Sequence, residues 1–262
     1  MIRALFTAAS GMSAQQMMID VISNNIANVN TTGYKASRAE FEDLLYQTLR
    51  APGAPTETGM QVPSGIQVGL GVKPTAVQRI FTQGDLVNTG NDLDIAINGD
   101  GFFQVTMPDG TTSYTKAGNF SLDKDGNVVT PDGYLLYPAV TIPTTATKVT
   151  VSFDGVVNIL TAGQTAPTQT GQITLARFIN PGGLQAIGKN LFQATDASGD
   201  PITGNPDSPG FGDVSQDYLE NSNVNVVSEL ANLITAQRAF DMNSKAVQTA
   251  DQMLQTTAAM KQ

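Results

Sequence analysis

Two closely spaced carboxylates, Asp92 and Asp94, are the residues of this chain best placed to do chemistry. Residues two apart on a strand share one face, and paired carboxylates are what glycoside hydrolysis requires, for example in an enzyme that acts on peptidoglycan. The two aspartates alternate with Leu93, Ile95 and Ile97, however, as on a half-buried strand. We therefore interpret them as the solvent-facing side of that strand.

Two other motifs only partly match a binding site. Residues 123–127 read Asp-Lys-Asp-Gly-Asn, but the glycine is fourth and the twelfth position is Tyr134. A calcium loop of the EF-hand type needs glycine sixth and glutamate twelfth, so a hairpin turn is favoured. Residues 69–71 read Gly-Leu-Gly and lack both the third glycine and the following helix of a dinucleotide site.

The chain contains no His and no Cys. Ser10, Ser13 and Ser23 therefore have no histidine to activate them, and thiolate nucleophiles and thiolate metal ligands are excluded. We predict no catalytic residue, no cofactor and no metal site. The protein is not expected to be an enzyme.

Charge is sparse, at 14% of 262 residues, with a net value of −9. No basic patch is available to neutralise phosphates, which argues against nucleic acid as a partner. No run approaches the roughly 18 apolar residues of a membrane span, so we expect no membrane insertion. The apolar stretch Ala4–Ala9 is short for a signal peptide, and we expect export without N-terminal cleavage.

Apolar residues recur every seven positions in both terminal segments, which is the pattern of helices that pack on other helices. The predicted anchors are Leu5, Met12, Ile19 and Ile26 at the front and Val226, Leu233, Phe240, Val247 and Leu254 at the back. Such a stripe is most often ordinary core. The terminal segments are nearly neutral and hold seven of the nine methionines, and flexible thioethers suit adaptable interfaces. We therefore interpret the nine anchors as subunit-interface residues.

The fold class that follows is α+β: long terminal helices pair as a coiled-coil-like stem, and a mainly antiparallel β domain is inserted between them. The front helix should end near Asn30, with Gly33 at positive φ, and Asn225 should cap the back helix. Residues 34–49 suit a short amphipathic helix or an extended arm. The Gly- and Pro-rich residues 51–74 exclude a helix.

Asp-Gly pairs at 109, 125, 132 and 154, and Asn98-Gly99, mark turns between short strands of a sandwich or irregular barrel. The predicted domains are a terminal helical domain, 1–30 with 224–262, connecting arms at 31–72 and 211–223, and an outer β domain, 73–210. This arrangement is more typical of an assembly subunit than of an enzyme.

Three segments resemble the flagellar rod and hook proteins, and together they span the chain. The front segment is Asn24-Asn25-Ile26-Ala27-Asn28-Val29-Asn30-Thr31-Thr32-Gly33-Tyr34-Lys35, in which Asn24, Asn25, Asn28, Gly33 and Tyr34 stand out. The central segments are 93–103 and 114–120, and the back helix matches through 222–225 and 236–247. Residues 68–74 and 78–84 look most like the distal rod branch of that family.

The resemblance implies a structural subunit that polymerises helically into a rigid, hollow drive shaft, which transmits torque to the hook and passes exported subunits. It implies a homo-oligomeric tube in contact with proximal rod proteins, hook protein, surrounding ring proteins and the flagellar type III export apparatus. It places the protein in the basal body, in a rod that spans the periplasm. Rivals are a hook or proximal rod subunit, or a secreted β-sandwich adhesin.

The uncharged polar side of the last helix suggests a further role. Gln237, Gln248, Gln252 and Gln255 could line a channel without binding unfolded cargo tightly. An ordinary solvated helix face explains the same pattern equally well.

Overall fold

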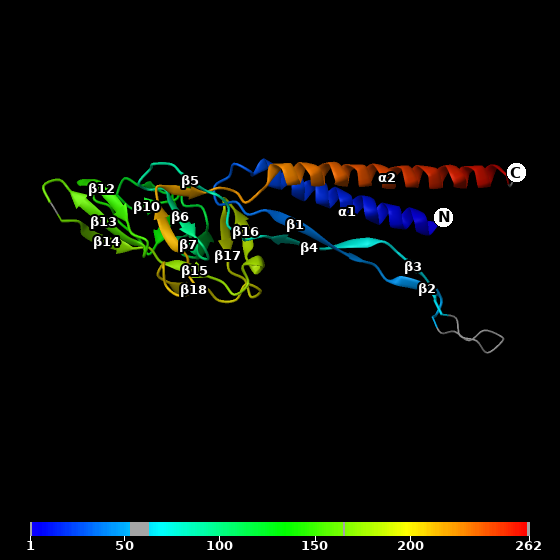
Figure 1. Ribbon diagram of the computed structural model, residues 1–262, viewed down its shortest axis with the longest axis horizontal. Coiled ribbons are helices and arrows are strands. Elements are labelled where there is room, and N and C mark those ends of the chain that lie inside the picture. Colours follow the sequence, from blue (N-terminus) through cyan, green and yellow to red (C-terminus); the bar gives the residue numbers. More distant parts are fainter. Residues whose placement is uncertain (1, 53–62, 165, 261–262) are drawn as a thin grey trace. The chain divides into compact units, whose positions relative to one another are not determined.

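The computed structural model describes residues 2–52, 63–164 and 166–260, and the chain divides into two compact units. The helical unit comprises Met1–Ile26, Ser37–Gln78 and Asn225–Gln262. The β unit comprises Ala27–Ala36 and Arg79–Val224. The chain is thus α+β, with the β part inserted between terminal helices (Figure 1).

Two long helices form the terminal part, as predicted. Helix α1 spans Ile2–Ala27 and helix α2 spans Val226–Ala259. Helix α1 ends three residues earlier than expected, and the chain then turns until Gly33, whose φ is +68°. The predicted cap of α2 is confirmed, since the Asn225 side chain accepts a hydrogen bond from the Ser228 backbone N–H at 3.1 Å.

Small residues mark the buried faces of the two helices. Ala8 and Ala14 are buried on α1, and Ala236 and Ala250 on α2. A Cβ added at Gly11 would lie 2.9 Å from Asn243 Nδ2, so α1 and α2 approach closely at that point. Small side chains let helix backbones come together, and Gly11 is where α1 approaches α2 in this way.

The remainder of the helical unit is an arm of two-stranded ribbons. Strand β1 (Ser37–Asp43) pairs with β4 (Val72–Arg79), and β2 (Tyr46–Arg50) pairs antiparallel with β3 (Ile66–Gly69). Of the two predictions for residues 34–49, the extended arm is therefore correct. Residues 53–62 of the Gly- and Pro-rich segment lie outside the described residues.

The β unit is built from short antiparallel strands. Its largest sheet has nine strands: β7 (Phe102–Thr106), β8 (Thr112–Thr115), β9 (Ser121–Leu122), β10 (Val128–Val129), β11 (Leu135–Tyr137), β15 (Leu175–Arg177), β16 (Gln185–Gly188), β17 (Leu191–Gln193) and β18 (Ile202–Gly204). A three-stranded sheet contains β12 (Ala146–Val151), β13 (Val156–Thr161) and β14 (Thr168–Gln172). Two ribbons pair β6 (Ile95–Asn98) with β19 (Asp213–Gln216) and β5 (Leu86–Asn88) with β20 (Tyr218–Glu220), and Pro181–Gly183 form a 3-10 turn, η1.

All four predicted Asp-Gly turns join strands that pair with each other. They connect β7 with β8, β9 with β10, β10 with β11, and β12 with β13. Their glycines at 110, 126, 133 and 155 have φ between +77° and +84°. Glycine adopts this backbone conformation without the steric cost of a Cβ, which is why the dipeptide is a dependable turn signal.

Two boundaries differ from the sequence-based expectation. Gly99 has a φ of +114° but makes no hairpin, because β6 pairs with β19 near the other end of the chain. The segment 211–223, expected as a return arm, contributes β19 and β20 and lies in the β unit. Local turn chemistry does not reveal a partner strand more than a hundred residues away.

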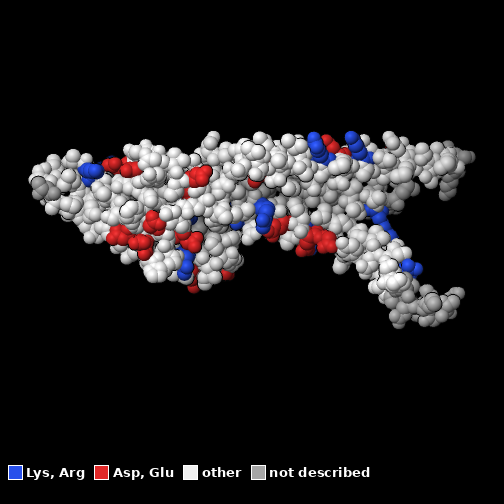
Figure 2. Space-filling model, in the orientation of Figure 1, with Lys and Arg blue, Asp and Glu red and all other residues white. Residues whose placement is uncertain are grey.

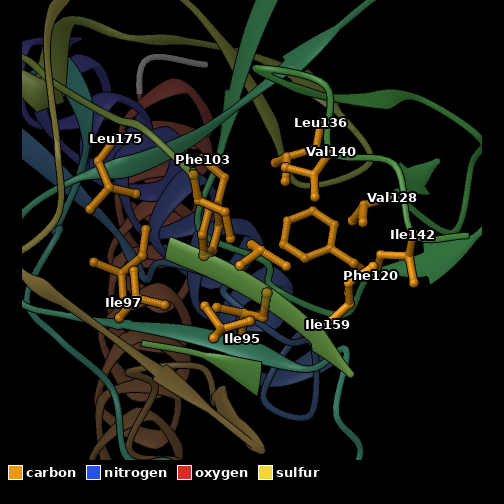
Figure 3. Close-up of a cluster of buried hydrophobic side chains, with 14 residues drawn as sticks. Ile95, Ile97, Phe103, Phe120, Val128, Leu136, Val140, Ile142, Ile159 and Leu175 are labelled. Carbon is orange, nitrogen blue, oxygen red and sulfur yellow. The ribbon is translucent and has the colours of Figure 1, made fainter. Parts of the chain in front are cut away.

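The main core of the β unit joins strands from several sheets. Ile95, Ile97, Phe103 and Phe120 are almost fully buried in it, and the rings of Phe103 and Phe120 meet edge to face with centroids 5.1 Å apart (Figure 3). A second cluster surrounds Phe102. These two cores hold the β unit together.

Candidate assembly surface

The nine predicted interface anchors form a partly covered stripe. Val226 is 37% exposed, and the others are half-buried: Leu5, Met12, Ile19, Ile26, Leu233, Phe240, Val247 and Leu254. Two of the buried side chains of α1, Ala8 and Ile22, lie three positions after an anchor. The anchors therefore flank the contact between α1 and α2, and each leaves apolar surface uncovered.

Helix α2 carries further large apolar side chains outside its buried positions. Val227, Leu230 and Ile234 are 78%, 45% and 51% exposed, and Met242 and Met253 are also exposed. At about 100° per residue, Ile234 and Val227 point away from the buried Ala236. We call Val227, Leu230, Ile234, Met242 and Met253 the outer stripe. The face of α2 seen in Figure 2 has few charged side chains.

The arm also exposes large apolar side chains. Leu45 is 85% exposed and Tyr46, Leu49 and Val77 at least half. A two-stranded ribbon is at best marginally stable alone in water, so apolar surface on such an arm indicates a partner that covers it. An open hollow of about 540 Å³ lies in the same unit, between the start of α1, strand β3 and Asn243.

Asn25 of the family motif ties three elements of the helical unit together. Its side chain is 1% exposed, Oδ1 accepts from the Ser37 backbone N–H at 2.9 Å, and Nδ2 donates to the Ser37 carbonyl at 2.8 Å. Nδ2 also lies 3.4 Å from Glu229 Oε1, and burial raises the pKa of Glu229. One amide thus joins α1, the start of β1 and the first turn of α2.

The other motif residues occupy the turn after α1. Asn28 Oδ1 accepts from Thr31 Oγ1 at 3.2 Å, Asn24 is exposed on α1 and Tyr34 is half-buried. Gly33 N–H donates to the Glu220 carbonyl at 2.8 Å. A Cβ added at Gly33 would lie 2.6 Å from the Ala117 nitrogen, so this position requires glycine for space as well as for its positive φ.

A buried ion cluster lies directly after the motif, inside the β unit. Lys35 Nζ donates to Glu220 Oε1 at 2.6 Å and to the Thr82 carbonyl at 2.7 Å, and Lys35 and Glu220 are each 1% exposed. Lys116 Nζ lies 3.9 Å from Glu220 Oε2. Burial lowers the pKa of Lys116 to about 8, and the nearby Glu220 carboxylate opposes part of this effect. The sequence analysis did not find this cluster, since nothing local relates Lys35 to Glu220.

The cluster joins the segments by which the chain enters and leaves the β unit. Lys35 belongs to the first entry, Thr82 to the second, and Glu220 to the exit. Asn223 strengthens the same junction: its Oδ1 accepts from the Ala36 N–H at 2.7 Å and its Nδ2 donates to the Ile80 carbonyl at 2.8 Å. The three crossings are therefore held in one buried polar network.

The candidate catalytic pair is not a site. Asp94 is only 8% exposed, and its carboxylate accepts hydrogen bonds from Thr89 Oγ1 at 2.6 Å and Asn91 Nδ2 at 3.1 Å. The interpretation of both aspartates as a solvent face was therefore wrong for Asp94, which supports a turn, and right for the exposed Asp92. Across the described residues, no three His, Cys, Asp or Glu side chains gather as a metal site.

The candidate channel residues share an exposed side of α2. Gln237, Gln248, Gln252 and Gln255 are all exposed, and Gln255 Nε2 donates to Asp251 Oδ2 at 2.9 Å. Neither α1 nor α2 is apolar enough over a sufficient length to cross a membrane in its described residues.

Three family models match this chain. The model described as flagella basal body rod protein matches residues 5–35, and that of the flagellar hook protein FlgE/F/G D1 domain matches residues 96–159. The model of the flagellar basal body rod FlgEFG protein C-terminal matches residues 215–260. The matches include the family motif, the strands around β6 and β7, and almost all of α2.

Curated relatives are similar over the whole length. A flagellar basal-body rod protein FlgG of Caulobacter vibrioides is 54% identical over 260 residues, 99% of each chain. One of Agrobacterium fabrum is 53% identical over 252 residues, 96% of each chain. A flagellar hook protein FlgE of Helicobacter mustelae is 44% identical over 137 residues, 52% of this chain and 30% of its own. The chain therefore belongs to the flagellar basal-body rod proteins, and is a structural subunit of the distal rod type rather than an enzyme.

Proposed function

We propose that copies of this chain assemble through the helical unit into a hollow, helically ordered rod that transmits torque to the hook. In this rod, α1 and α2 pair as a coiled-coil-like stem and form the inner tube, the ribbon arm braces neighbouring copies, and the β unit faces outward. The nine heptad anchors and the outer stripe are the subunit interface. Relative to the predicted boundaries, residues 27–36 and 211–223 are assigned to the outer part and residues 73–78 to the arm.

The outer stripe of α2 is the observation that carries this proposal. Ala236 and Ala250 are covered within the chain, while Val227, Leu230 and Ile234 on the opposite face remain in water. A helix with apolar residues on opposite faces is usually buried on both of them. Within one chain, only the face with Ala236 and Ala250 is covered. A neighbouring copy covers the other face.

The arm supports the same proposal. Its ribbons expose Leu45, Leu49 and Val77, which would be costly for a free monomer but suit packing against a second copy. Ladder hydrogen bonds between β1 and β4 and between β2 and β3 make the arm stiffer than a loop. An arm packed between copies would resist the sliding that lets a tube bend.

We also assign the glutamines of α2 to the channel of the rod; Gln248, Gln252 and Gln255 lie on the same side of the helix as Val227 and Ile234, but further along it. Gln237, Gln248, Gln252 and Gln255 bear no charge that would bind an unfolded cargo chain electrostatically. Replacing Gln248 or Gln252 by Lys should slow export of later subunits in motile cells, while Gln248→Asn should not. Normal export in both lysine variants would remove the channel assignment.

The proposed partners of this chain follow from its position in such a rod. They are proximal rod proteins on one side, hook protein on the other, surrounding ring proteins, and the type III export apparatus that delivers the chain without N-terminal cleavage. The relatives named as basal-body rod and hook proteins support this placement, which puts the protein in a rod that spans the periplasm.

Ile234→Asp tests the assembly. A carboxylate in the outer stripe should prevent polymerisation, because it would be buried against an apolar neighbour. Sedimentation velocity and electron microscopy of the purified chain would then show filaments for the native protein and for Ile234→Leu, and monomers for Ile234→Asp. Filaments of normal length from Ile234→Asp would contradict the proposal.

A further inference from the structure

A cavity of about 410 Å³ in the β unit has an aromatic floor that reaches the surface. Phe102 and Phe178 are each 3% exposed and line it, with ring centroids 5.8 Å apart in an edge-to-face arrangement. Phe81 packs on Phe102 at 5.5 Å in the same way. At the rim, Ile179 is 82% exposed. The cavity is large enough for an aromatic side chain, and its floor presents the ring edges and faces that another ring would contact.

The charged residues of the cavity are mostly cationic. Lys116 and Arg177 line it together with one carboxylate, Asp100. Lys116 is 4% exposed and shares the Glu220 carboxylate with Lys35, which holds Glu220 Oε1 at 2.6 Å. In the described part of the chain, the Arg177 guanidinium makes no salt bridge and lies 5.7 Å from the Phe211 ring centroid. A further carboxylate would therefore be stabilised here.

The low proton affinity of Lys116 is consistent with this view. Its pKa falls to about 8 because burial disfavours the ammonium ion more than Glu220 favours it. A second carboxylate in the cavity would supply further counter-charge and raise the pKa of Lys116 back toward its ordinary value.

The β unit also presents an aromatic and acidic tip of matching chemistry. Phe153 is 69% exposed, more than any other aromatic residue described in the β unit, and the exposed Asp154 follows it in the turn between β12 and β13. The turn is well held: Val214 N–H donates to the Phe153 carbonyl at 3.2 Å and Gln172 Nε2 donates to the Asp154 carbonyl at 3.1 Å. The tip is thus ordered before it meets a partner, which lowers the entropic cost of binding.

We propose that Phe153 and Asp154 of one copy insert into this cavity of the next copy. The Phe153 ring rests on Phe102 and Phe178, and the Asp154 carboxylate faces Lys116 and Arg177. This inference rests on the proposed polymerisation and adds to it a contact between β units. The contact joins two different surfaces, and a head-to-tail contact of this kind propagates into an open helix rather than closing as a dimer.

The net negative charge of the β unit opposes contact between two copies except at a site with positive charge. The β unit carries 15 Asp and Glu against 7 Lys and Arg, so two copies repel each other in general. The cationic cavity attracts the acidic tip of another copy although the β units as a whole repel each other. A contact that forms only at this site can set the register of neighbouring β units.

Disulfide trapping tests the contact directly, because the chain has no cysteine of its own. In Ser152→Cys/Ile179→Cys, which keeps Phe153 and Asp154, the tip of one copy would lie beside the rim of the next. Oxidation of the assembled protein should give a ladder of covalent multimers. Each single variant should stop at dimers, and the matched pair Tyr137→Cys/Ile179→Cys, with Tyr137 52% exposed, should give no ladder.

A charge exchange provides the second measurement. Asp154→Lys and Arg177→Glu should each raise the concentration needed for assembly, by about tenfold for a desolvated charge contact. The double variant Asp154→Lys/Arg177→Glu should restore the native assembly concentration. If either residue had only a structural role, the second substitution would not compensate for the first. Circular dichroism and denaturation of each variant monitor the fold.

The outcomes separate this contact from the polymerisation itself. Native filaments with no ladder from the tip and rim cysteines, or with an equal ladder from the Tyr137 control pair, would overturn the contact and leave the polymer standing. A native chain that forms no filament would overturn both. A covalent product between the Ile179→Cys rim and a cysteine placed on added hook protein, with no ladder between copies, would assign the cavity to that protein instead and overturn the contact between copies.

Discussion

At the scale of single residues, the chain uses buried polar groups to fix where segments cross. Lys35, Glu220 and Asn223 join the entry and exit segments of the β unit, and Asn25 joins α1, β1 and α2. Buried polar groups are costly unless they are paired, so each pairs with a defined partner and disfavours other arrangements. These few residues determine the alignment of the crossings.

Glu220→Gln should destabilise the β unit by about 3–5 kcal/mol, because it leaves Lys35 and Lys116 buried without a carboxylate. Urea unfolding followed by tyrosine fluorescence measures this loss. Glu42→Gln is the matched control: its ion pair with Lys73 is exposed, and its loss should be undetectable. Equal stability of the Glu220→Gln variant and the native protein would show that the cluster contributes nothing to the fold.

The lowered pKa of Lys116 predicts that the free energy of unfolding rises with pH in the alkaline range. Its folded pKa of about 8 lies below the ordinary lysine value of 10.5, so between these pH values the unfolded chain binds more protons than the folded one. The free energy of unfolding should therefore increase from pH 8 to pH 10, relative to that of Lys116→Met. Parallel pH profiles of the two proteins would contradict this.

At the scale of elements, periodicity located the helices but not which of their residues are buried. The seven-residue repeats correctly predicted two long helices, while the buried positions are Ala8, Ala14, Ile22 and Asn25 on α1 and Ala236 and Ala250 on α2. The apolar pattern indicates which side of a helix is turned away from water. It does not indicate where two helix backbones approach most closely, which is where small side chains are needed. In the arm, glycine and proline excluded a helix over residues 51–74 without specifying a partner strand, and residues 34–49 were left open between a short helix and an extended arm.

Asn25→Ala should loosen the end of α1 and the start of β1 by about 1–3 kcal/mol, because the Ser37 N–H and carbonyl lose their partner. Hydrogen exchange should show faster exchange at Ser37 and in the first turn of α2, with the β unit unchanged. Ser23→Ala, an exposed position on the same helix, is the control. Unchanged exchange at Ser37 would contradict the assigned role.

At the scale of the whole molecule, charge and apolar surface are divided between the two units. Nearly all of the net charge of −9 belongs to the β unit, and the helical unit is close to neutral. The β unit has two buried apolar clusters of its own, whereas much of the large apolar surface of α2 and the arm is exposed. Neutral, apolar surfaces suit close packing of copies, and an acidic surface keeps the resulting polymer soluble.

Limited proteolysis of the dilute monomer should reveal this division. Trypsin is expected to cut first in the helical unit, at sites such as Arg38, Arg238 and Lys245, and to leave a resistant fragment near 79–224. The reason is that local unfolding requires less free energy where fewer apolar contacts are buried. In assembled filaments the same sites should be protected. Early cleavage within the β unit of the monomer would contradict the expectation.

Some features depended on the sequence alone, since they arise from local chemistry. Asp-Gly turns, the Asn225 cap and the family motifs need only neighbouring residues and are present as predicted, and α1 ends three residues before its predicted end. The tertiary structure alone decided which strands pair, how deep Asp94 lies, that Lys35 meets Glu220, and which face of α2 stays open. Those facts depend on residues far apart in the chain, whose meeting is determined by the packing of the whole and leaves no local pattern.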